Sequence, residues 1–264
     1  MKTIKELCKE IKGIYNIDGR DNTEITGISA DSRKIEKGFL FVCIAGVHVD
    51  GATFAGQAVE KGAVAVLTNK HLDLPLEITQ ITVPDIHAAL EDIVPYFYDY
   101  PGKKMRMIGV TGTNGKTTTS HIIAHILREA GYHVGVIGTI HALIDDKELE
   151  IHNTTPDVVE LQALLALMYA EGMDYVVMEV SSHALALNRV AGIEYDTAVF
   201  TNLTQDHLDF HKSFENYVAA KAKLFSGLTA EPPVKKNKTA VINIDDPHAD
   251  EILKATSCKV LTYG

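Results

Sequence analysis

The run from Met107 to Thr119 constrains the fold of this 264-residue chain more than any other segment. Apolar residues lead into Gly112-Thr-Asn-Gly115, and Lys116 follows at once. Glycine takes positive φ and lets backbone N–H groups approach a ligand, while the N-terminus of a following helix favours an anion. The pattern therefore predicts a buried strand, a phosphate-binding loop and a helix that begins at Lys116.

This loop predicts a site for a nucleoside triphosphate. Lys116 supplies a cation for the β- and γ-phosphates, and Thr117 supplies a hydroxyl for Mg²⁺. The common pattern has glycine where this chain has Val110, and glycines stand instead at Gly109 and Gly112. The alternative is a Gly-rich strand-to-helix turn without a ligand. The predicted ATP-binding residues are Gly112, Thr113, Asn114, Gly115, Lys116, Thr117 and Thr118.

The spacing Gly112-Thr-Asn-Gly-Lys-Thr-Thr118 resembles the Mur ligases, which build the peptide of bacterial cell-wall precursors. The resemblance implies an α/β protein in two parts. A small N-terminal domain that binds a uridine diphosphate substrate would span residues 1–102. A doubly wound, parallel-sheet, P-loop ATPase domain would span residues 103–264, with the boundary at Pro101-Gly102. Family members continue into a C-terminal ligase domain, so we expect a central domain cut short and a chain that is inactive alone.

Composition excludes several other classes. The chain is 46% hydrophobic and 23% charged, and its net charge of -10 disfavours nucleic acid as a partner. No apolar run approaches the roughly 20 residues of a membrane helix, and the N-terminus lacks the core of a signal peptide. Cys8, Cys43 and Cys258 are odd in number and far apart, as expected of reduced thiols. We expect a cytoplasmic monomer without a membrane partner.

Two N-terminal segments resemble the uridine-diphosphate-binding domain of the family, namely Ala30-Asp-Ser-Arg33 and the run 38–51. The resemblance implies that Ser32 contacts the diphosphate or uracil, and that Val47, His48 and Val49 line the same pocket. From the residues alone, Ser32 is more typical of a turn and His48 of a loop.

Strands and helices alternate after the loop, as in a doubly wound sheet, so ligand-binding residues are expected at the carboxyl ends of strands. The turn Asn153-Thr-Thr-Pro-Asp157 precedes a predicted helix at 158–169, and capping of that helix is its simplest explanation. Glu179 ends an apolar strand, where a buried carboxylate needs a cation or a donor. The resemblance assigns Glu179 to Mg²⁺ and assigns the muramoyl-peptide substrate to Asn153, Thr154, Thr155, Ser181 and Arg189.

His207 and Lys221 follow further on. The resemblance implies that His207 binds a second Mg²⁺ and that carbon dioxide converts Lys221 to a carbamate, so that Thr117, Glu179, His207 and Lys221 hold the two ions. A carbamate replaces a repelled ammonium with an oxygen ligand. By itself Lys221 looks like a surface lysine. His121 and His125 are four residues apart but have no further ligand nearby in sequence, which disfavours a zinc site.

Taken together, the resemblance implies an ATP-dependent amide-bond ligase with Lys116, His207 and Lys221 as catalytic residues. Its substrate would be UDP-N-acetylmuramoyl-L-alanyl-D-glutamate, its intermediate an acyl phosphate, and its third-residue amino acid diaminopimelate or L-lysine. Three alternatives stay open: a fragment that only binds nucleotide and UDP-sugar, the sibling ligase that adds D-alanyl-D-alanine, and a folate-polyglutamating ligase.

Overall fold

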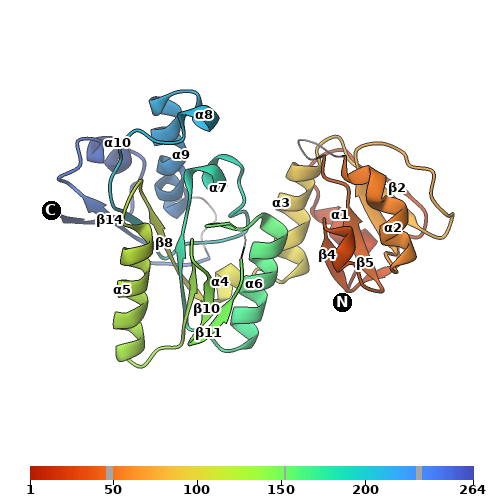
Figure 1. Cartoon of the computed structure of the whole chain (residues 1–264), viewed down its shortest axis with the longest axis horizontal. Coiled ribbons are helices and arrows are strands. Elements are labelled where there is room, and N and C mark those ends of the chain that lie inside the picture. Colours follow the sequence, from red (N-terminus) through yellow and green to blue (C-terminus); the bar gives the residue numbers. More distant parts are fainter. Residues whose placement is uncertain (46–49, 152, 230–233) are drawn as a thin grey trace. The chain divides into compact units, whose positions relative to one another are not determined.

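The computed structural model describes residues 1–45, 50–151, 153–229 and 234–264 (Figure 1). The chain divides into two compact units, Met1–Asp99 and Tyr100–Gly264. The predicted boundary at residues 102 and 103 falls inside a short helix, α4 (Pro101–Lys104), so Pro101 and Gly102 begin a helix and do not form an irregular hinge. Val47, His48 and Val49, predicted to line a uridine pocket, lie outside the described residues.

The first unit is built on a five-stranded sheet in the order β2-β7-β6-β5-β4. Its four neighbouring strands from β7 to β4 are parallel, and β2 is antiparallel to β7. The strands are β2 (Asn16–Asp18), β4 (Gly27–Ser29), β5 (Phe39–Val42), β6 (Ala65–Thr68) and β7 (Thr79–Thr82), and β1 (Lys2–Thr3) pairs with β3 (Glu24–Ile25) in a separate ribbon. The alternating run 23–29 predicts a single strand, and this prediction is wrong, because the chain leaves one sheet and enters another at Thr26.

Polar side chains cap two helices of the first unit, α1 and α3. Thr3 caps α1 (Ile4–Glu10), with Glu6 completing a reciprocal capping box, and Asp85 caps α3 (Ile86–Phe97) through the amide of Ala88. The remaining helical elements are α2 (Ala55–Glu60) and the 3₁₀ turns η1 (Ser32–Lys34) and η2 (Gly51–Phe54).

The second unit contains an eight-stranded sheet in the order β11-β10-β9-β12-β8-β13-β14-β15. The six strands from β9 to β15 in this order are parallel, which confirms the predicted doubly wound sheet. They are β8 (Arg106–Thr111), β9 (Val134–Ile137), β12 (Tyr175–Glu179), β13 (Thr197–Phe200), β14 (Thr239–Asn243) and β15 (Lys259–Tyr263). The apolar run 134–140 predicts one strand, but β9 ends at Ile137, and an antiparallel hairpin of β10 (Ala142–Ile144) and β11 (Lys147–Leu149) adds an unpredicted edge.

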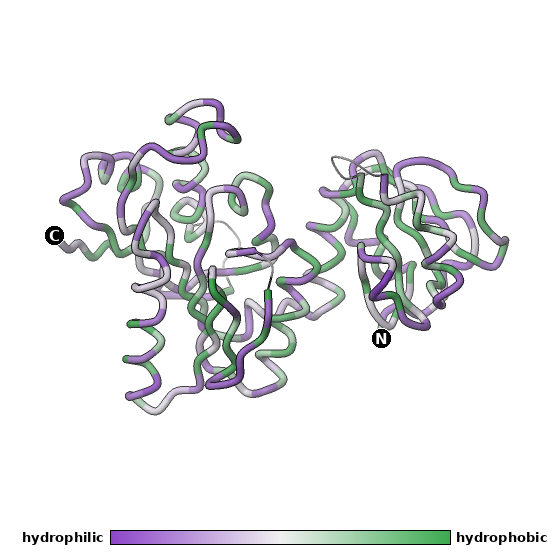
Figure 2. The backbone as a smooth tube through the Cα atoms, viewed as in Figure 1, coloured by the Kyte–Doolittle hydropathy of each residue, from purple (hydrophilic) through white to green (hydrophobic). Residues whose placement is uncertain are grey.

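Helices cover both faces of this sheet. Along β12, Val176 and Met178 pack into one hydrophobic cluster with α6 (Val158–Ala170) and α9 (Phe214–Ser226), while Val177 packs into another with α5 (Lys116–Glu129). Successive side chains of a strand point to opposite faces, so a parallel strand covered on both sides reads as a continuous apolar run. The hydropathy view shows the same hydrophobic strands in the interior (Figure 2). The other helical elements of this unit are α7 (Ser182–Ala186), α8 (Leu208–His211), η3 (Gly227–Thr229) and α10 (Ala249–Lys254).

Lys235, whose side chain is mostly buried, connects several segments of the second unit. Lys235 Nζ donates to the carbonyl oxygens of Gly102, Met105 and Glu194, and to Asp196 Oδ2 at 2.8 Å. Asp196 Oδ2 also accepts from the amide of Met107 at the start of β8. One side chain thus connects α4, β8 and the approach to β13.

Candidate active site

The loop between β8 and α5 is shaped by close contact with the end of β13. Gly112 has φ +152°, and a Cβ at this position would lie 1.9 Å from Thr201 Oγ1. That hydroxyl donates to the carbonyl oxygen of Asn114 at 2.7 Å, so it cannot turn away without losing a hydrogen bond. Only glycine fits this position.

The segment after β13 holds the rest of the loop. The amide of Thr113 donates to Asn202 O at 2.8 Å, and the amide of Asn114 donates to Asn202 Oδ1 at 3.0 Å. Thr113 Oγ1 accepts from the amide of Thr204 at 2.9 Å and lies 2.9 Å from the hydroxyl of Tyr217 on α9. The loop is therefore fixed by its neighbours before any ligand arrives.

Two lysines converge on one carbonyl oxygen of the loop. Lys221 Nζ, on α9, donates to Gly112 O at 2.8 Å, and Lys116 Nζ donates to the same atom at 3.0 Å and to Thr113 O at 2.9 Å. Burial, followed by repulsion from Lys116, lowers the pKa of Lys221 to about 7. Burial also lowers the pKa of Lys116, against the attraction of Glu179 and Asp206. Lys221 is only 2% exposed, so its interpretation as a surface lysine is wrong.

The start of α5 is open to a ligand. Gly115 stands at the N-cap with φ +82°, and no side chain caps the helix. The first amides of a helix have no carbonyl partner within it, and the helix dipole makes this end positive. The hydroxyl of Thr117 in this first turn forms no hydrogen bond among the residues that the structure describes, so it is available to a ligand.

Glu179 lies at the carboxyl end of β12 and is fully buried. Its oxygens accept from the amide of Thr139 at 3.0 Å and from Thr139 Oγ1 at 3.0 Å. No lysine, arginine or histidine in the described ranges forms an ion pair with it. A buried carboxylate with two donors and no ion-pair partner suits a divalent cation, which prefers oxygen ligands.

Thr155 joins the turn before α6 to the start of α7. Its hydroxyl donates to Glu179 O at 2.9 Å and accepts from the amide of Ser181 at 3.1 Å. Arg189 Nη1 donates to Thr155 O at 3.1 Å. Asp157 caps α6 as the sequence predicted, while Thr154 Oγ1 lies 3.1 Å from Thr139 Oγ1. Thr155 is thus a buried anchor, whereas Asn153 and Asp157 in the same turn are exposed.

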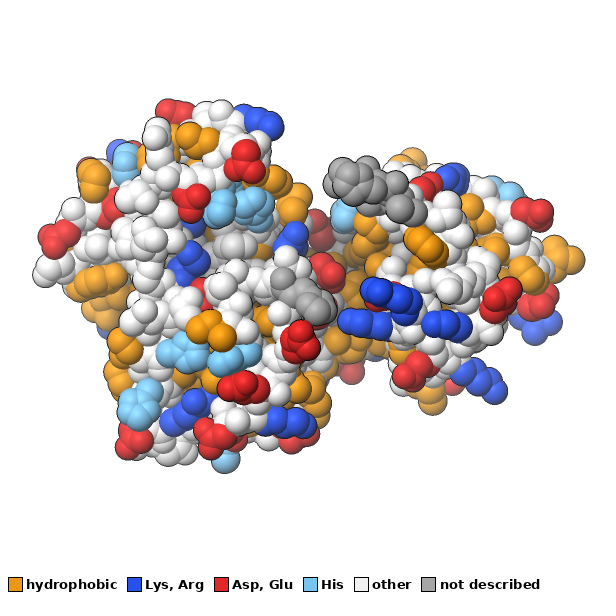
Figure 3. All heavy atoms as spheres, in the orientation of Figure 1, with side chains coloured by type: hydrophobic (Ala, Val, Ile, Leu, Met, Phe, Trp, Pro, Cys, Tyr) orange, Lys and Arg blue, Asp and Glu red, His pale blue; other side chains and the backbone are white. Residues whose placement is uncertain are grey.

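A hollow of about 290 Å³ lies beside Thr155 and Arg189. All of its lining residues are polar: Asn153, Thr154, Thr155, Ser181, His183, Arg189 and His207. The space-filling view shows histidine side chains exposed together over α7 and α8 (Figure 3). A guanidinium beside hydroxyl, amide and imidazole groups suits a ligand that carries a carboxylate.

Aromatic rings form one wall of this region. The ring of His183 lies 4.8 Å from that of His207 and 5.5 Å from that of His211. The ring of Tyr217 lies 6.3 Å from that of His207, and Lys221 Nζ lies 4.7 Å from the centroid of the Tyr217 ring. Burial, followed by repulsion from His207, lowers the pKa of His183, which favours its neutral form. Tyr217 therefore stands between the predicted metal ligands His207 and Lys221.

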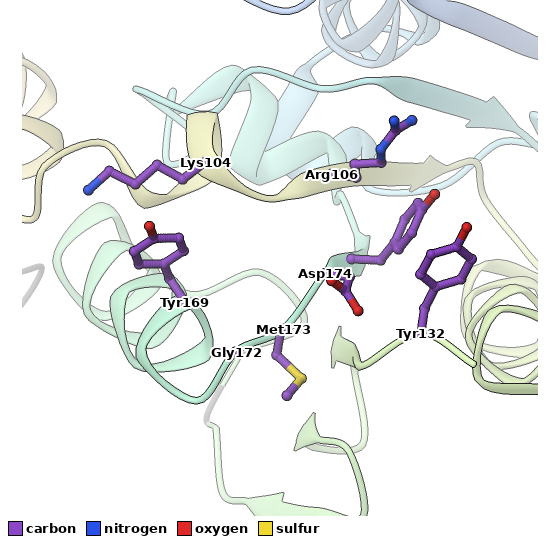
Figure 4. A pocket seen from close by; sticks show the side chains of 8 residues that line it. Lys104, Arg106, Tyr132, Tyr169, Gly172, Met173 and Asp174 are labelled. Atoms are coloured by element: carbon purple, nitrogen blue, oxygen red, sulfur yellow. The ribbon is translucent and has the colours of Figure 1, made fainter. Parts of the chain in front are cut away.

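A second, larger hollow of about 470 Å³ opens at the amino ends of β8 and β12 (Figure 4). Its cations do not converge: Lys104 lies over the ring of Tyr169 at 5.0 Å, and Arg106 lies over that of Tyr175 at 5.8 Å, on the other side of the hollow. Ligands of open α/β sheets bind at the carboxyl ends of the strands. The smaller hollow is therefore the better candidate.

In the first unit, Ser32 is buried at the start of η1, and its hydroxyl donates to Gln57 Oε1 at 2.8 Å. Asp31 caps the same turn through the amide of Arg33. The turn predicted at Ser32 is thus present, and Gln57 is a partner that the sequence did not suggest.

The structure brings together the predicted residues of the second unit around the loop and the polar hollow. It also places Thr139, His183, Asp206 and Tyr217 there. Thr139 follows β9, at the carboxyl end of a parallel strand where ligand-binding residues are expected, and Asp206 is adjacent to His207, so the sequence could have indicated both. Nothing in the sequence around His183 or Tyr217 indicated a place in this site.

No group of three or more His, Cys, Asp or Glu side chains in the described ranges is placed to hold a metal ion. The predicted ligand set contains only two residues of these types, Glu179 and His207. None of the helices in the described part of the chain has the length and the apolar stretch that spanning a bilayer requires.

Comparisons with known proteins agree with this architecture. The model of the Mur ligase middle domain matches residues 110–264, and that of the Mur ligase family catalytic domain matches residues 24–98. The chain is 47% identical over 264 residues to the UDP-N-acetylmuramoyl-L-alanyl-D-glutamate--2,6-diaminopimelate ligase of Syntrophomonas wolfei, and covers 100% of itself and 52% of that protein. It is 44% identical over 261 residues to the Listeria monocytogenes protein of the same name, and the match covers 99% of this chain and 52% of that protein.

Solved structures show the same relationship. A structure of a UDP-N-acetylmuramoyl-L-alanyl-D-glutamate--2,6-diaminopimelate ligase superposes with a TM-score of 0.76 at 31% identity, over 99% of this chain and 52% of that one. MurF from Acinetobacter baumannii has the same fold, with a TM-score of 0.73 at 22% identity. The match covers 99% of this chain and 53% of that one. The chain spans about half the length of the relatives it matches. With a middle-domain model covering residues 110–264 and the loop geometry described above, the chain belongs to the Mur ligase family.

Proposed function

We propose that this chain carries the nucleotide and acyl-substrate sites of an ATP-dependent ligase that extends UDP-N-acetylmuramoyl-L-alanyl-D-glutamate by diaminopimelate. The observation that carries the proposal is the convergence of Lys116 and Lys221 on Gly112 O, beside the buried Glu179 and the polar hollow of Arg189. The choice of diaminopimelate over lysine rests on the names of the relatives.

In this proposal the loop residues 112–118 hold the phosphates of ATP. Its amides and the uncapped start of α5 attract the anion, and Lys116 leaves the loop carbonyl oxygens for the phosphates. Thr117, Glu179, His207 and a carbamate on Lys221 would hold two Mg²⁺ ions, which neutralise charge on the transferring phosphoryl group when bound.

Different residues are proposed for the two ends of the acyl substrate. Ser32 would contact its uridine diphosphate end, with Gln57 orienting the hydroxyl. Asn153, Thr154, Ser181 and Arg189 would hold the muramoyl-peptide end, and Thr155 would position that wall. The terminal carboxylate attacks the γ-phosphorus of ATP and ADP leaves. The neutral amine of the amino acid then attacks the acyl phosphate, and its proton passes to the departing phosphate, which gives the amide and hydrogen phosphate.

Lys116→Ala tests the nucleotide site. We expect the affinity for ATP–Mg²⁺ to fall on the order of 10²-fold, because a charged hydrogen-bond partner of the phosphates is lost. Isothermal titration of the purified 264-residue chain with ATP–Mg²⁺ measures this, with the exposed Lys254→Ala as the matched control. Equal affinity in the Lys116 variant and the parent would refute the role of Lys116.

The proposed function itself is tested with the acyl substrate. The chain should bind UDP-N-acetylmuramoyl-L-alanyl-D-glutamate more tightly than UDP, because the peptide adds contacts at Arg189 and Ser181. Absence of binding by both UDP and the dipeptide substrate would contradict the proposal. Binding of UDP alone would favour a chain that recognises only the nucleotide-sugar end. Product formation in a mixture that also holds ATP, Mg²⁺ and either diaminopimelate or lysine would contradict the expectation that this chain is inactive alone.

A carbamate on Lys221 should form as the pH rises from 6 to 8. Carbon dioxide reacts with the neutral amine, and a lysine with pKa about 7 is about one tenth neutral at pH 6 and about nine tenths neutral at pH 8. Carbon-13 NMR in labelled bicarbonate should show a carbamate resonance that grows over this range. Lys221→Arg should lose the resonance, and Lys223→Arg, altered at an exposed position on the same helix, should keep it. The reverse pattern would exclude Lys221 as the modified residue.

A further inference from the structure

His183 lines the polar hollow but has no role in the assignments above. It follows Ser181, the N-cap of α7, and shares the wall with Arg189. Neither of its ring nitrogens forms a hydrogen bond within the described part of the chain. A side chain that can hydrogen-bond, lines a pocket and has no protein partner is available to a ligand.

Neighbouring rings fix the orientation of this imidazole. The ring of Phe210 stacks against it at 4.2 Å with a tilt of 37°, and the rings of His207 and His211 meet it edge-on at 4.8 Å and 5.5 Å. Packing on three sides limits rotation about the side chain. The ring is thus held in place with its nitrogens unbonded, as a preformed binding group requires.

The adjacent His211 shows the contrast with a structural histidine. It is 6% exposed, and its Nε2 lies 2.9 Å from Ser182 Oγ. It therefore has a protein partner and no access to the hollow. A purely structural role explains His211, which is buried and hydrogen-bonded. It does not explain His183, which is only half-buried and has no hydrogen-bond partner among the described residues.

The hollow identifies the chemistry of the ligand group that His183 meets. Arg189 supplies the single permanent charge among the lining side chains, and the others offer hydroxyl, amide or imidazole groups. We propose that His183 is a substrate-binding residue, which hydrogen-bonds an amide or hydroxyl group of the acyl substrate next to the carboxylate that Arg189 receives. This inference rests on the proposed function and extends it to a residue that selects the peptide part of the substrate.

His183→Phe tests the inference, because phenylalanine keeps the stack on Phe210 and removes both nitrogens. The affinity of the 264-residue chain for UDP-N-acetylmuramoyl-L-alanyl-D-glutamate should fall about tenfold, the effect of one lost hydrogen bond of about 1.4 kcal/mol. Affinities for UDP and for ATP–Mg²⁺ should stay unchanged. His183→Gln should recover part of the loss, and the exposed His87→Phe, in the first unit, serves as the matched control.

Nitrogen-15 NMR of histidine-labelled parent chain provides a readout that does not depend on the variant's fold. The two ring resonances missing from the His183→Phe spectrum should shift when the dipeptide substrate is added and stay in place with UDP. Unshifted resonances, or equal affinities of parent and variant, would overturn the inference while the proposed function stands. Failure of the parent chain to bind the dipeptide substrate would instead overturn the proposed function, and the inference with it.

Discussion

Gly112→Ala should destabilise the second unit by about 3 to 5 kcal/mol and abolish ATP binding. The new methyl group would lie 1.9 Å from Thr201 Oγ1 and 3.0 Å from the backbone of Asn202, at a φ of +152°. Relief requires movement of β13 or of the loop, and overpacking and backbone strain each cost about 1 to 3 kcal/mol. Urea unfolding, together with titration by ATP–Mg²⁺, measures both effects.

Gly115→Ala is the matched control for this prediction. Gly115 also has positive φ, +82°, but no atom lies within 4 Å of the added methyl group. This variant should lose only about 1 to 2 kcal/mol of stability, the cost of a left-handed backbone conformation for a residue with a Cβ. If both variants lost the same stability, steric contact with Thr201 would not be the reason for glycine at position 112.

Lys235→Met should also destabilise the second unit, by about 1 to 3 kcal/mol, because it removes the donor of several partly buried acceptors. The variant would leave Asp196 without its cation and three carbonyl oxygens without their donor. Lys236→Met, at the exposed neighbouring position, should change stability by less than about 0.5 kcal/mol. A loss below about 1 kcal/mol for Lys235→Met in urea unfolding would show that the network contributes little.

The sequence predicted the parts of the fold that short-range chemistry determines. The helix at Lys116 and the cap at Asp157 follow from residue types at fixed spacing, and both are present. Apolar periodicity also located the parallel strands, because their burial on both faces requires continuous apolar runs.

Features that depend on distant contacts could not be predicted in this way. Lys221 is buried because α9 packs against the loop. The residues around position 221 in the sequence do not predict this contact. The β10–β11 hairpin was missed because the apolar run 134–140 continues past the turn. The apolar residues Ile122, Ile123, Ile126 and Leu127 predict one buried face of α5. Ile122 and Ile126 are nevertheless 55% and 61% exposed, because the sheet contacts the adjacent strip of Ile123 and Leu127.

The two edges of the eight-stranded sheet differ in a way that matters for handling the protein. At one edge β11 has only three residues, and Lys147 and Glu148 are exposed. At the other, β15 is five residues long and pairs on one side only among the described residues. It presents Leu261 and Tyr263 at 48% and 44% exposure. A longer, apolar, unpaired edge is a template for strand addition between molecules. Concentrated samples of the chain will therefore self-associate through β15 and not through the hairpin, and a lysine in place of Leu261 is the direct way to keep them in solution.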